Sequence, residues 1–158
     1  MACRALDAEQ VNLGFSGSAR GEAAMAELIA SIGGLAAFVM DYDYNAPNPE
    51  HLLATHEPFF EAIRAVYPEL PVVMLTKCDI WRHKGYAVSC QRRDIVKETY
   101  DKAVAAGDRH VYFVDGETLF GDTDREACTV DGCHPNDFGF HRMFENVLPT
   151  LRRALAEA

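Results

Sequence analysis

Short apolar runs alternate with amphipathic stretches along the chain, and this order restricts the fold more than any other feature of the sequence. Four runs contain few polar residues and are too short for buried helices, so we interpret them as buried strands: residues 10–15, 35–42, 71–77 and 110–116. Strands that are almost continuously apolar are covered on both faces, which is typical of a parallel sheet between layers of helices.

Apolar residues recur at helical spacing in the segments between and after these runs. The sequence predicts helices over residues 22–32, 49–67, 92–106 and 137–156. We expect Pro58 to break or kink the second helix and Gly107 to end the third. Asn136 or Asp137 is expected to cap the fourth. The alternation predicts one doubly wound α/β domain over residues 1–158, with its ligand beyond the carboxyl ends of the strands.

The composition limits the partners of the chain. Its net charge of -9 argues against nucleic acid or an anionic membrane as a partner, because phosphate groups are bound by basic surfaces. No apolar run has the roughly 18–20 residues that a membrane span needs. The first ten residues lack the apolar core of a signal peptide. Taking the chain as given, we expect a cytoplasmic protein; the location of a longer form, whose leader could precede these residues, stays open.

The cysteines do not indicate a disulfide framework. Their number is odd, in a chain long enough to bury a sizeable core: Cys3, Cys78, Cys90, Cys128 and Cys133. Free thiols are expected in a reducing cytosol. The redox state of Cys128 and Cys133 stays open, with a local disulfide or a metal site as the alternatives.

The segment TVDGCHPND places an acid three residues before a histidine. A histidine that acts as a general base needs one ring nitrogen near the nucleophile and the other held by a carboxylate. Asp131 and His134 can meet this requirement within one turn, so they are candidate catalytic residues. The motif is short and common, and the competing interpretation is a surface loop in which both residues serve as turn and cap residues.

Two further segments follow expected strands. In GFSGSARG, the N–H of Gly17 can donate to an oxyanion, although a tight turn would also need a glycine. Ser16 nearly fits the nucleophile pattern G-x-S-x-G, but Ser18 replaces the last glycine, so Ser16 is a weak candidate nucleophile. In DYDYNAPNPE, Asn45 offers an amide donor for an oxyanion, and an Asx-turn explains it about equally well.

Together these segments resemble the SGNH hydrolases, also called GDSL-type esterases and lipases. Gly17 matches the oxyanion glycine of the family's second block, and Asn45 matches the oxyanion asparagine of its third. Asp131 and His134 match the acid and the base of its last block, D-x-x-H. The resemblance covers nearly the whole chain. It implies a flavodoxin-like three-layer α/β/α fold and acyl transfer through a serine, with no metal or organic cofactor.

The chain departs from the family pattern in two blocks. Asp43 and Ala46 stand where the third block, G-x-N-D, has glycine and aspartate. The first block, G-D-S or G-x-S, carries the nucleophilic serine and has no counterpart before residue 10. The resemblance therefore implies an N-terminally truncated domain without its first strand and helix. In the family's strand order, 2-1-3-4-5, the absent strand lies between residues 10–15 and 35–42, and an apolar edge left there invites self-association.

The leading interpretation is a serine ester hydrolase for a small or carbohydrate-linked ester, inactive or weak as the chain stands. One alternative is a non-catalytic binding protein on the same fold, which the missing serine supports; a zinc site from Cys128, Cys133 and His134 is a minor variant of it. The other is a magnesium-dependent phosphohydrolase. Against this alternative, the sequence contains no glycine-rich phosphate loop. It would use four aspartates at strand ends: Asp41, Asp43, Asp79 and Asp115.

Overall fold

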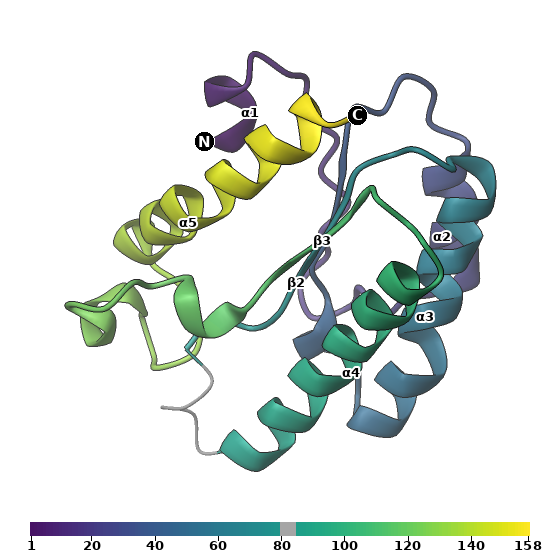
Figure 1. The fold of residues 1–158 in the computed structure, drawn as a ribbon. Helices are drawn as coiled ribbons and strands as arrows, with labels where there is room; N and C mark the ends of the chain where they lie inside the picture. Colours follow the sequence, from purple (N-terminus) through teal and green to yellow (C-terminus); the bar gives the residue numbers. More distant parts are fainter. Residues whose placement is uncertain (80–84) are drawn as a thin grey trace.

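The computed structural model describes residues 1–79 and 85–158 and alternates strands with helices along the chain (Figure 1). The helices are α1 (Ala2–Ala5), α2 (Ala23–Ala30), α3 (Pro49–Val66), α4 (Tyr86–Ala105) and α5 (Asp137–Ala156). The strands are β1 (Phe38–Met40), β2 (Val72–Leu75) and β3 (Val111–Val114). Short 3-10 helices follow two of the strands and precede α5: η1 (Asp43–Asn45), η3 (Gly116–Thr118) and η4 (Arg125–Cys128).

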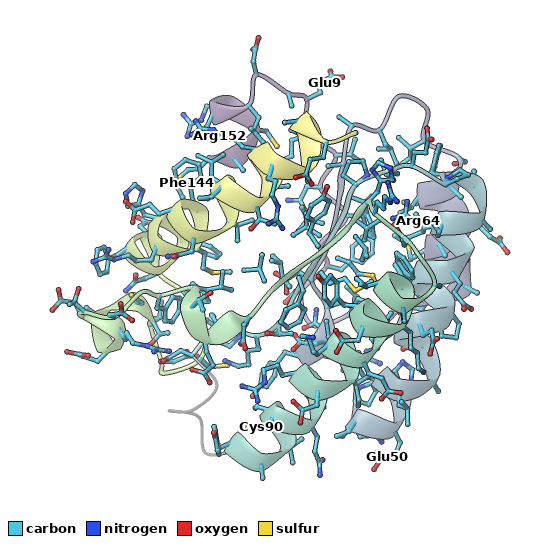
Figure 2. All side chains as sticks on the ribbon, in the orientation of Figure 1. Glu9, Glu50, Arg64, Cys90, Phe144 and Arg152 are labelled. Carbon is cyan, nitrogen blue, oxygen red and sulfur yellow. The ribbon has the colours of Figure 1, made fainter. Side chains whose placement is uncertain are left out.

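The three strands form a parallel sheet in the order β1-β2-β3, between two helical layers (Figure 1). Helices α2, α3 and α4 cover one face, while α5 and α1 cover the other. Alternate residues of β2 face opposite layers, so Val72 packs with the first layer and Val73 with the second. Side chains fill the space between the sheet and both layers (Figure 2). The predicted three-layer α/β/α fold is confirmed.

The predicted first strand, residues 10–15, is wrong. This segment is irregular, and its Val11 and Phe15 are 57% and 52% exposed. A strand needs a neighbour for its backbone N–H and C=O groups. In the strand order that the resemblance implies, another strand separates this segment from β1, so the two cannot pair. Self-association through the free edge of β1, where Val39 is partly exposed, stays a prediction.

The predicted helix ends are mostly confirmed. Pro58 does not break α3: both Pro58 and Ala54, whose carbonyl loses its helical partner, are exposed to water. Gly107 follows the end of α4 with φ 92°, and Asn136 caps α5 by accepting from the N–H of Gly139. Helix α4 begins six residues before the predicted start. No helix in the described ranges is long and apolar enough to cross a membrane.

Candidate active site

Residues 129–136, here called the His134 loop, connect η4 to α5. Hydrogen bonds within the loop stabilise its conformation. Asp131 Oδ1 accepts from the backbone N–H groups of Cys133 (2.9 Å) and His134 (2.8 Å). Asp131 Oδ2 lies 2.7 Å from His134 Nδ1. Gly132 supplies the positive φ, 82°, that this tight turn needs. The predicted Asp131–His134 hydrogen bond is confirmed.

The His134 loop presents an ionised acid beside a free base nitrogen. Hydrogen bonds from the backbone and ring of His134, and from the backbone of Cys133, hold the pKa of Asp131 well below its usual range. The His134 side chain is 77% exposed, and its Nε2 has no hydrogen-bond partner in the described part of the chain. In the tautomer that donates from Nδ1 to Asp131, Nε2 can accept a proton from a nucleophile.

Residues 43–46, here called the Asn45 turn, follow β1 and are bound by residues from α4 and from the segment after β2. The Arg92 guanidinium of α4 donates from Nη1 to the carbonyl oxygens of Asp43 (2.6 Å) and Ala46 (2.8 Å). The backbone N–H of Lys77, after β2, donates to Asp43 Oδ2 at 3.0 Å. The Asn45 side-chain amide makes no hydrogen bond to any residue that the structure describes, so its two N–H donors are available to a ligand.

Asp43 carries an unusual acid group at the base of this turn. Its side chain is 3% exposed. Burial, and then the neighbouring carboxylate of Asp41, raises the pKa of Asp43 to about 7. Backbone N–H groups of Lys77 and Tyr44, and the charge of Arg92, act in the opposite direction. The Asp43 carboxyl is therefore expected to change charge near neutral pH.

Tyr44 connects the Asn45 turn to the His134 loop. Burial, and then the adjacent thiol of Cys133, raises the pKa of Tyr44, so these two side chains are in contact. The Lys77 ammonium lies 4.7 Å from the centre of the Tyr44 ring. Since Tyr44 precedes Asn45 and Cys133 precedes His134, the structure brings these two candidate residues to the same edge of the sheet.

Gly17 belongs to a separate segment, whose later residues contact Tyr42 and the start of α3. Its φ is +61°, an added Cβ would meet nothing within 4 Å, and its N–H has no partner in the described part of the chain. The segment is anchored to the start of α3, because the Arg20 carbonyl lies 3.0 Å from His51 Nε2, and to Tyr42, which contacts Gly21. No hydrogen bond between Gly17 and His134 occurs in the described part of the chain, so their sharing of one cavity stays a prediction.

The chain has four serines, and the structure describes all of them. Ser18 bonds to the Ser16 carbonyl, Ser31 bonds to its own helix, and Ser89 is buried in α4. Ser16 is exposed. None of the four hydroxyls makes a hydrogen bond to His134 within the described ranges. Ser16 therefore stays a weak candidate nucleophile.

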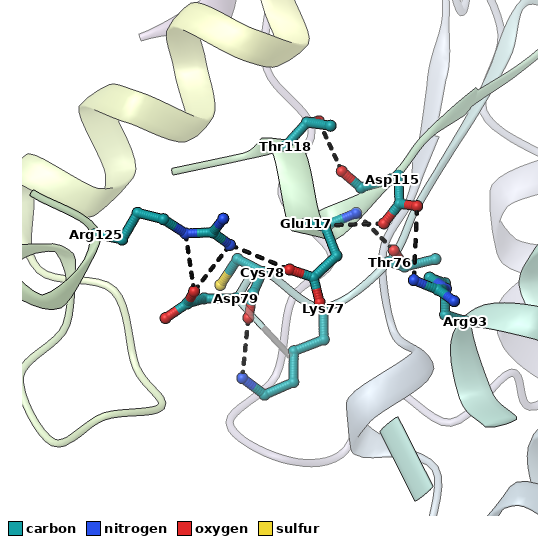
Figure 3. Close-up of polar contacts among 10 residues, drawn as sticks. Thr76, Lys77, Cys78, Asp79, Arg93, Asp115, Glu117, Thr118 and Arg125 are labelled. Carbon is teal, nitrogen blue, oxygen red and sulfur yellow. Dashed lines mark hydrogen bonds and ion pairs between the residues drawn. The ribbon is translucent and has the colours of Figure 1, made fainter. Parts of the chain in front are cut away.

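Arg125 links η4, which precedes the His134 loop, to residues at the ends of the strands (Figure 3). Its guanidinium Nη2 lies 2.9 Å from Asp79 Oδ1, after β2, and 3.1 Å from Glu117 Oε2, in η3. The strand ends meet closely here: an added Cβ on Gly116 would overlap the Lys77 carbonyl. Because Arg125 begins η4, which leads directly into the loop, this ion-pair network fixes where the loop starts.

The aspartate cluster that the phosphohydrolase alternative would need does not form among the described residues. Asp43 accepts from a backbone N–H, Asp79 pairs with Arg125, and Asp115 caps η3 by accepting from the N–H of Glu117. No group of three or more histidine, cysteine or acidic side chains that could hold a metal ion occurs among the described residues. Neither the magnesium site nor the zinc site with Cys128 receives support.

Sequence reasoning missed Arg92, Tyr44 and Arg125. A signal for Arg92 was present, because it falls on the stripe of α4 that is buried: Ser89, Arg92, Val96, Thr99 and Ala103. A buried cation needs acceptors, so an arginine on such a stripe indicates a polar partner across the helix interface. Arg125 and Tyr44 carry no comparable pattern, since their partners come from distant segments.

Similar solved structures share this fold. A GDSL-like lipase from Bacteroides ovatus is 27% identical (TM-score 0.80) and matches 92% of this chain and 43% of its own. A salicylyl-acyltransferase from a tetracycline biosynthetic pathway is 19% identical (TM-score 0.78; 99% and 47% covered). A family two carbohydrate esterase from Clostridium thermocellum is 17% identical (TM-score 0.73; 98% and 52% covered). The present chain thus spans about half the length of these proteins.

A family model identifies the chain where individual sequences do not. No curated protein matches the sequence. The model of the GDSL-like lipase/acylhydrolase family matches residues 1–152, a range that includes the Asn45 turn and the His134 loop. The match therefore covers nearly the whole chain, in agreement with the parallel sheet and its two helical layers. This chain belongs to the GDSL-like lipase/acylhydrolase family.

Proposed function

We propose that this chain supplies the acid–base pair and the oxyanion donors of an ester hydrolase that works by acyl transfer to a serine. The hydrogen bond between His134 Nδ1 and Asp131 Oδ2, at 2.7 Å, carries the proposal because it leaves Nε2 free to act as a base. The substrate is a small or carbohydrate-linked ester. Similarity of fold to a carbohydrate esterase supports the second class by analogy.

Each proposed residue has a defined role in the reaction. His134 Nε2 takes the proton of the attacking serine and later returns it to the leaving alcohol. Asp131 stays ionised and stabilises the imidazolium. The N–H of Gly17 and the amide of Asn45 hold the negative charge that develops on the carbonyl oxygen. Water then hydrolyses the acyl-serine, with His134 again as the base.

The attacking serine, in this proposal, is not one of the four serines of this chain. Ser16 is the nearest by sequence pattern, but its place beside Gly17 suits the wall of the oxyanion site better than attack on a bound carbonyl. The chain as given is therefore expected to be a poor esterase. The activity of any longer form that contains this chain is part of the same proposal.

The first prediction tests the missing nucleophile. A strand, a serine loop of the family's first-block pattern G-D-S and a helix are joined ahead of Met1, and hydrolysis of p-nitrophenyl acetate is compared with that of the chain alone. We expect a gain on the order of 10³-fold or more, because a triad without its serine loses covalent catalysis. A fluorophosphonate probe should label the chimera at the added serine only.

Matched variants make this experiment specific. In the chimera, His134→Ala should abolish the gain, whereas His141→Ala, which alters an exposed histidine of α5, should not. In the chain alone, Ser16→Ala and Ser18→Ala should change little. Strong activity of the chain alone that disappears with Ser16→Ala would overturn the proposal and identify Ser16 as the nucleophile.

A non-catalytic binding role is the second candidate. The observation that favours it is the absence of any serine hydroxyl bonded to His134 in the described ranges. An inactive chimera, together with calorimetric binding of an acetylated cello-oligosaccharide by the chain alone, would support this role instead.

A further inference from the structure

The Asn45 turn is too short to define its own geometry. It is a three-residue 3-10 helix, a form with poor hydrogen-bond geometry. Its nearby support comes from short-range bonds: the N–H of Asn45 donates to the carbonyl of Tyr42, just before the turn, at 3.0 Å, and the N–H of Tyr44 bonds to the Asp43 carboxyl. An oxyanion donor must stay aimed at one point in space to be effective. Something outside the turn must therefore hold it.

Arg92 meets this need from the middle of the buried stripe of α4. It is 6% exposed, and one nitrogen, Nη1, donates to the carbonyl oxygens of Asp43 and Ala46. These two carbonyls lie on either side of Asn45 in the sequence. Burying a guanidinium costs free energy unless its N–H groups have well-placed acceptors. Here the acceptors are backbone carbonyls, so these charge-assisted bonds restrain the backbone of the turn.

A second anchor restrains the same turn from the sheet. Asp43 Oδ2 accepts from the backbone N–H of Lys77, directly after β2. The Tyr44 ring lies over both neighbouring cations, 4.7 Å from the Lys77 ammonium and 5.9 Å from the Arg92 guanidinium carbon. The turn is thus fastened to α4 by its carbonyls and to the segment after β2 by the Asp43 carboxyl, while the Asn45 side-chain amide makes no hydrogen bond to the residues that the structure describes.

We infer that Arg92 is a positioning residue for Asn45: its hydrogen bonds to the Asp43 and Ala46 carbonyls hold the Asn45 amide in the orientation that an oxyanion requires. The inference rests on the proposed function, because it assumes that Asn45 is an oxyanion donor. Arg92 itself touches no reacting atom. Its contribution passes entirely through the backbone of the turn.

The second prediction compares Arg92→Lys with Arg93→Lys in the serine-bearing chimera. Lysine keeps the charge but is shorter and lacks the planar fork, so we expect kcat to fall about 10- to 100-fold with KM nearly unchanged. Arg93, the next residue of α4, pairs with Asp94 and Asp115 instead, and its substitution should leave kcat within about twofold. Both variants are first checked for folding by circular dichroism.

A double substitution separates positioning from general stabilisation. Asn45→Ala alone should lower kcat about 10²- to 10³-fold, the usual effect of losing one oxyanion donor. If Arg92 acts only through Asn45, Arg92→Lys combined with Asn45→Ala should be no slower than Asn45→Ala alone. Full additivity of the two losses, or an unchanged kcat in Arg92→Lys, would overturn the inference while leaving the proposed function intact.

A measurement on the chain as given tests the same inference without catalysis. The side-chain amide of Asn45 should give one sharp pair of nitrogen–proton NMR signals in the unaltered chain and in Arg93→Lys. It should broaden or split in Arg92→Lys. If the chimera proves inactive but this difference appears, the proposed function fails, while the structural part of the inference, that Arg92 holds the Asn45 amide in one orientation, stands. An unchanged Asn45 signal in Arg92→Lys would reject the positioning role.

Discussion

The Asn45 turn and the His134 loop lie at the same edge of the sheet but are secured in opposite ways. The loop is exposed, and the carboxylate of Asp131 makes its bonds to residues two and three positions away. The turn is buried at Asp43, and its bonds come from Lys77 and Arg92, 34 to 49 positions away in the sequence. One half of the candidate site is a local motif, and the other exists only in the folded domain.

This difference separates two kinds of functional geometry. A local motif tolerates changes elsewhere in the domain, because its own residues fix its shape. The conformation of a turn that is held by α4 and by the end of β2 depends on how those elements pack. The turn therefore changes conformation when they shift. Substitutions should therefore affect global stability strongly at the turn and weakly at the loop.

The largest expected effect on stability is that of Arg92→Met. It leaves the buried Asp43 and Ala46 carbonyls without their donor, and each unsatisfied buried acceptor costs about 1–3 kcal/mol, so we expect the free energy of unfolding to fall by about 2–5 kcal/mol. Urea denaturation of the chain as given measures it. Arg93→Met should stay within about 0.5 kcal/mol of the unaltered chain, and equal losses in both variants would contradict the comparison.

An intermediate effect is expected from the pH dependence of the turn. The pKa of Asp43 is raised to about 7 in the folded protein, so between pH 4 and 7 the folded state keeps a proton that the unfolded chain has lost. Its contribution to the free energy of unfolding therefore falls as the pH rises through this window, by up to roughly 1.4 kcal/mol per pH unit, and is level above it.

The measurement is the difference in stability between the unaltered chain and Asp43→Asn at each pH. The difference is needed because burial lowers the pKa of His56 to about 4, and His56 gives a slope of opposite sign as the pH falls from about 6.5 to 4. A difference that does not change between pH 4 and 7 would show that Asp43 is ionised in the folded protein throughout.

The smallest expected effect is that of Asp131→Asn in the His134 loop. Asp131 is exposed and its bonds are local, so the urea midpoint should hardly move. Hydrogen exchange should accelerate at the amides of Cys133 and His134, which donate to Asp131 Oδ1. Because the pKa of Asp131 is depressed, these amides should stay protected in the unaltered chain as the pH falls below 4. A large loss of global stability would show that the loop supports the fold.

The same division explains what the sequence could predict. The Asp131–His134 bond was predictable because both residues and all donors lie within one turn. Helix α5 and strands β2 and β3 were predictable from apolar spacing. Residues 10–15 have the composition of a strand, but a strand also needs an adjacent partner, which composition does not reveal. The Arg92 bonds depend on how α4 docks, so only the presence of a buried arginine was readable.

The close meeting of β2 and β3 at Gly116 also bears on how this site could be redesigned. The backbone of Lys77 occupies the volume that any side chain at position 116 would fill, so this point is closed to variation. A change of substrate preference would therefore have to come from substitutions or length changes in the connecting loops around Gly116.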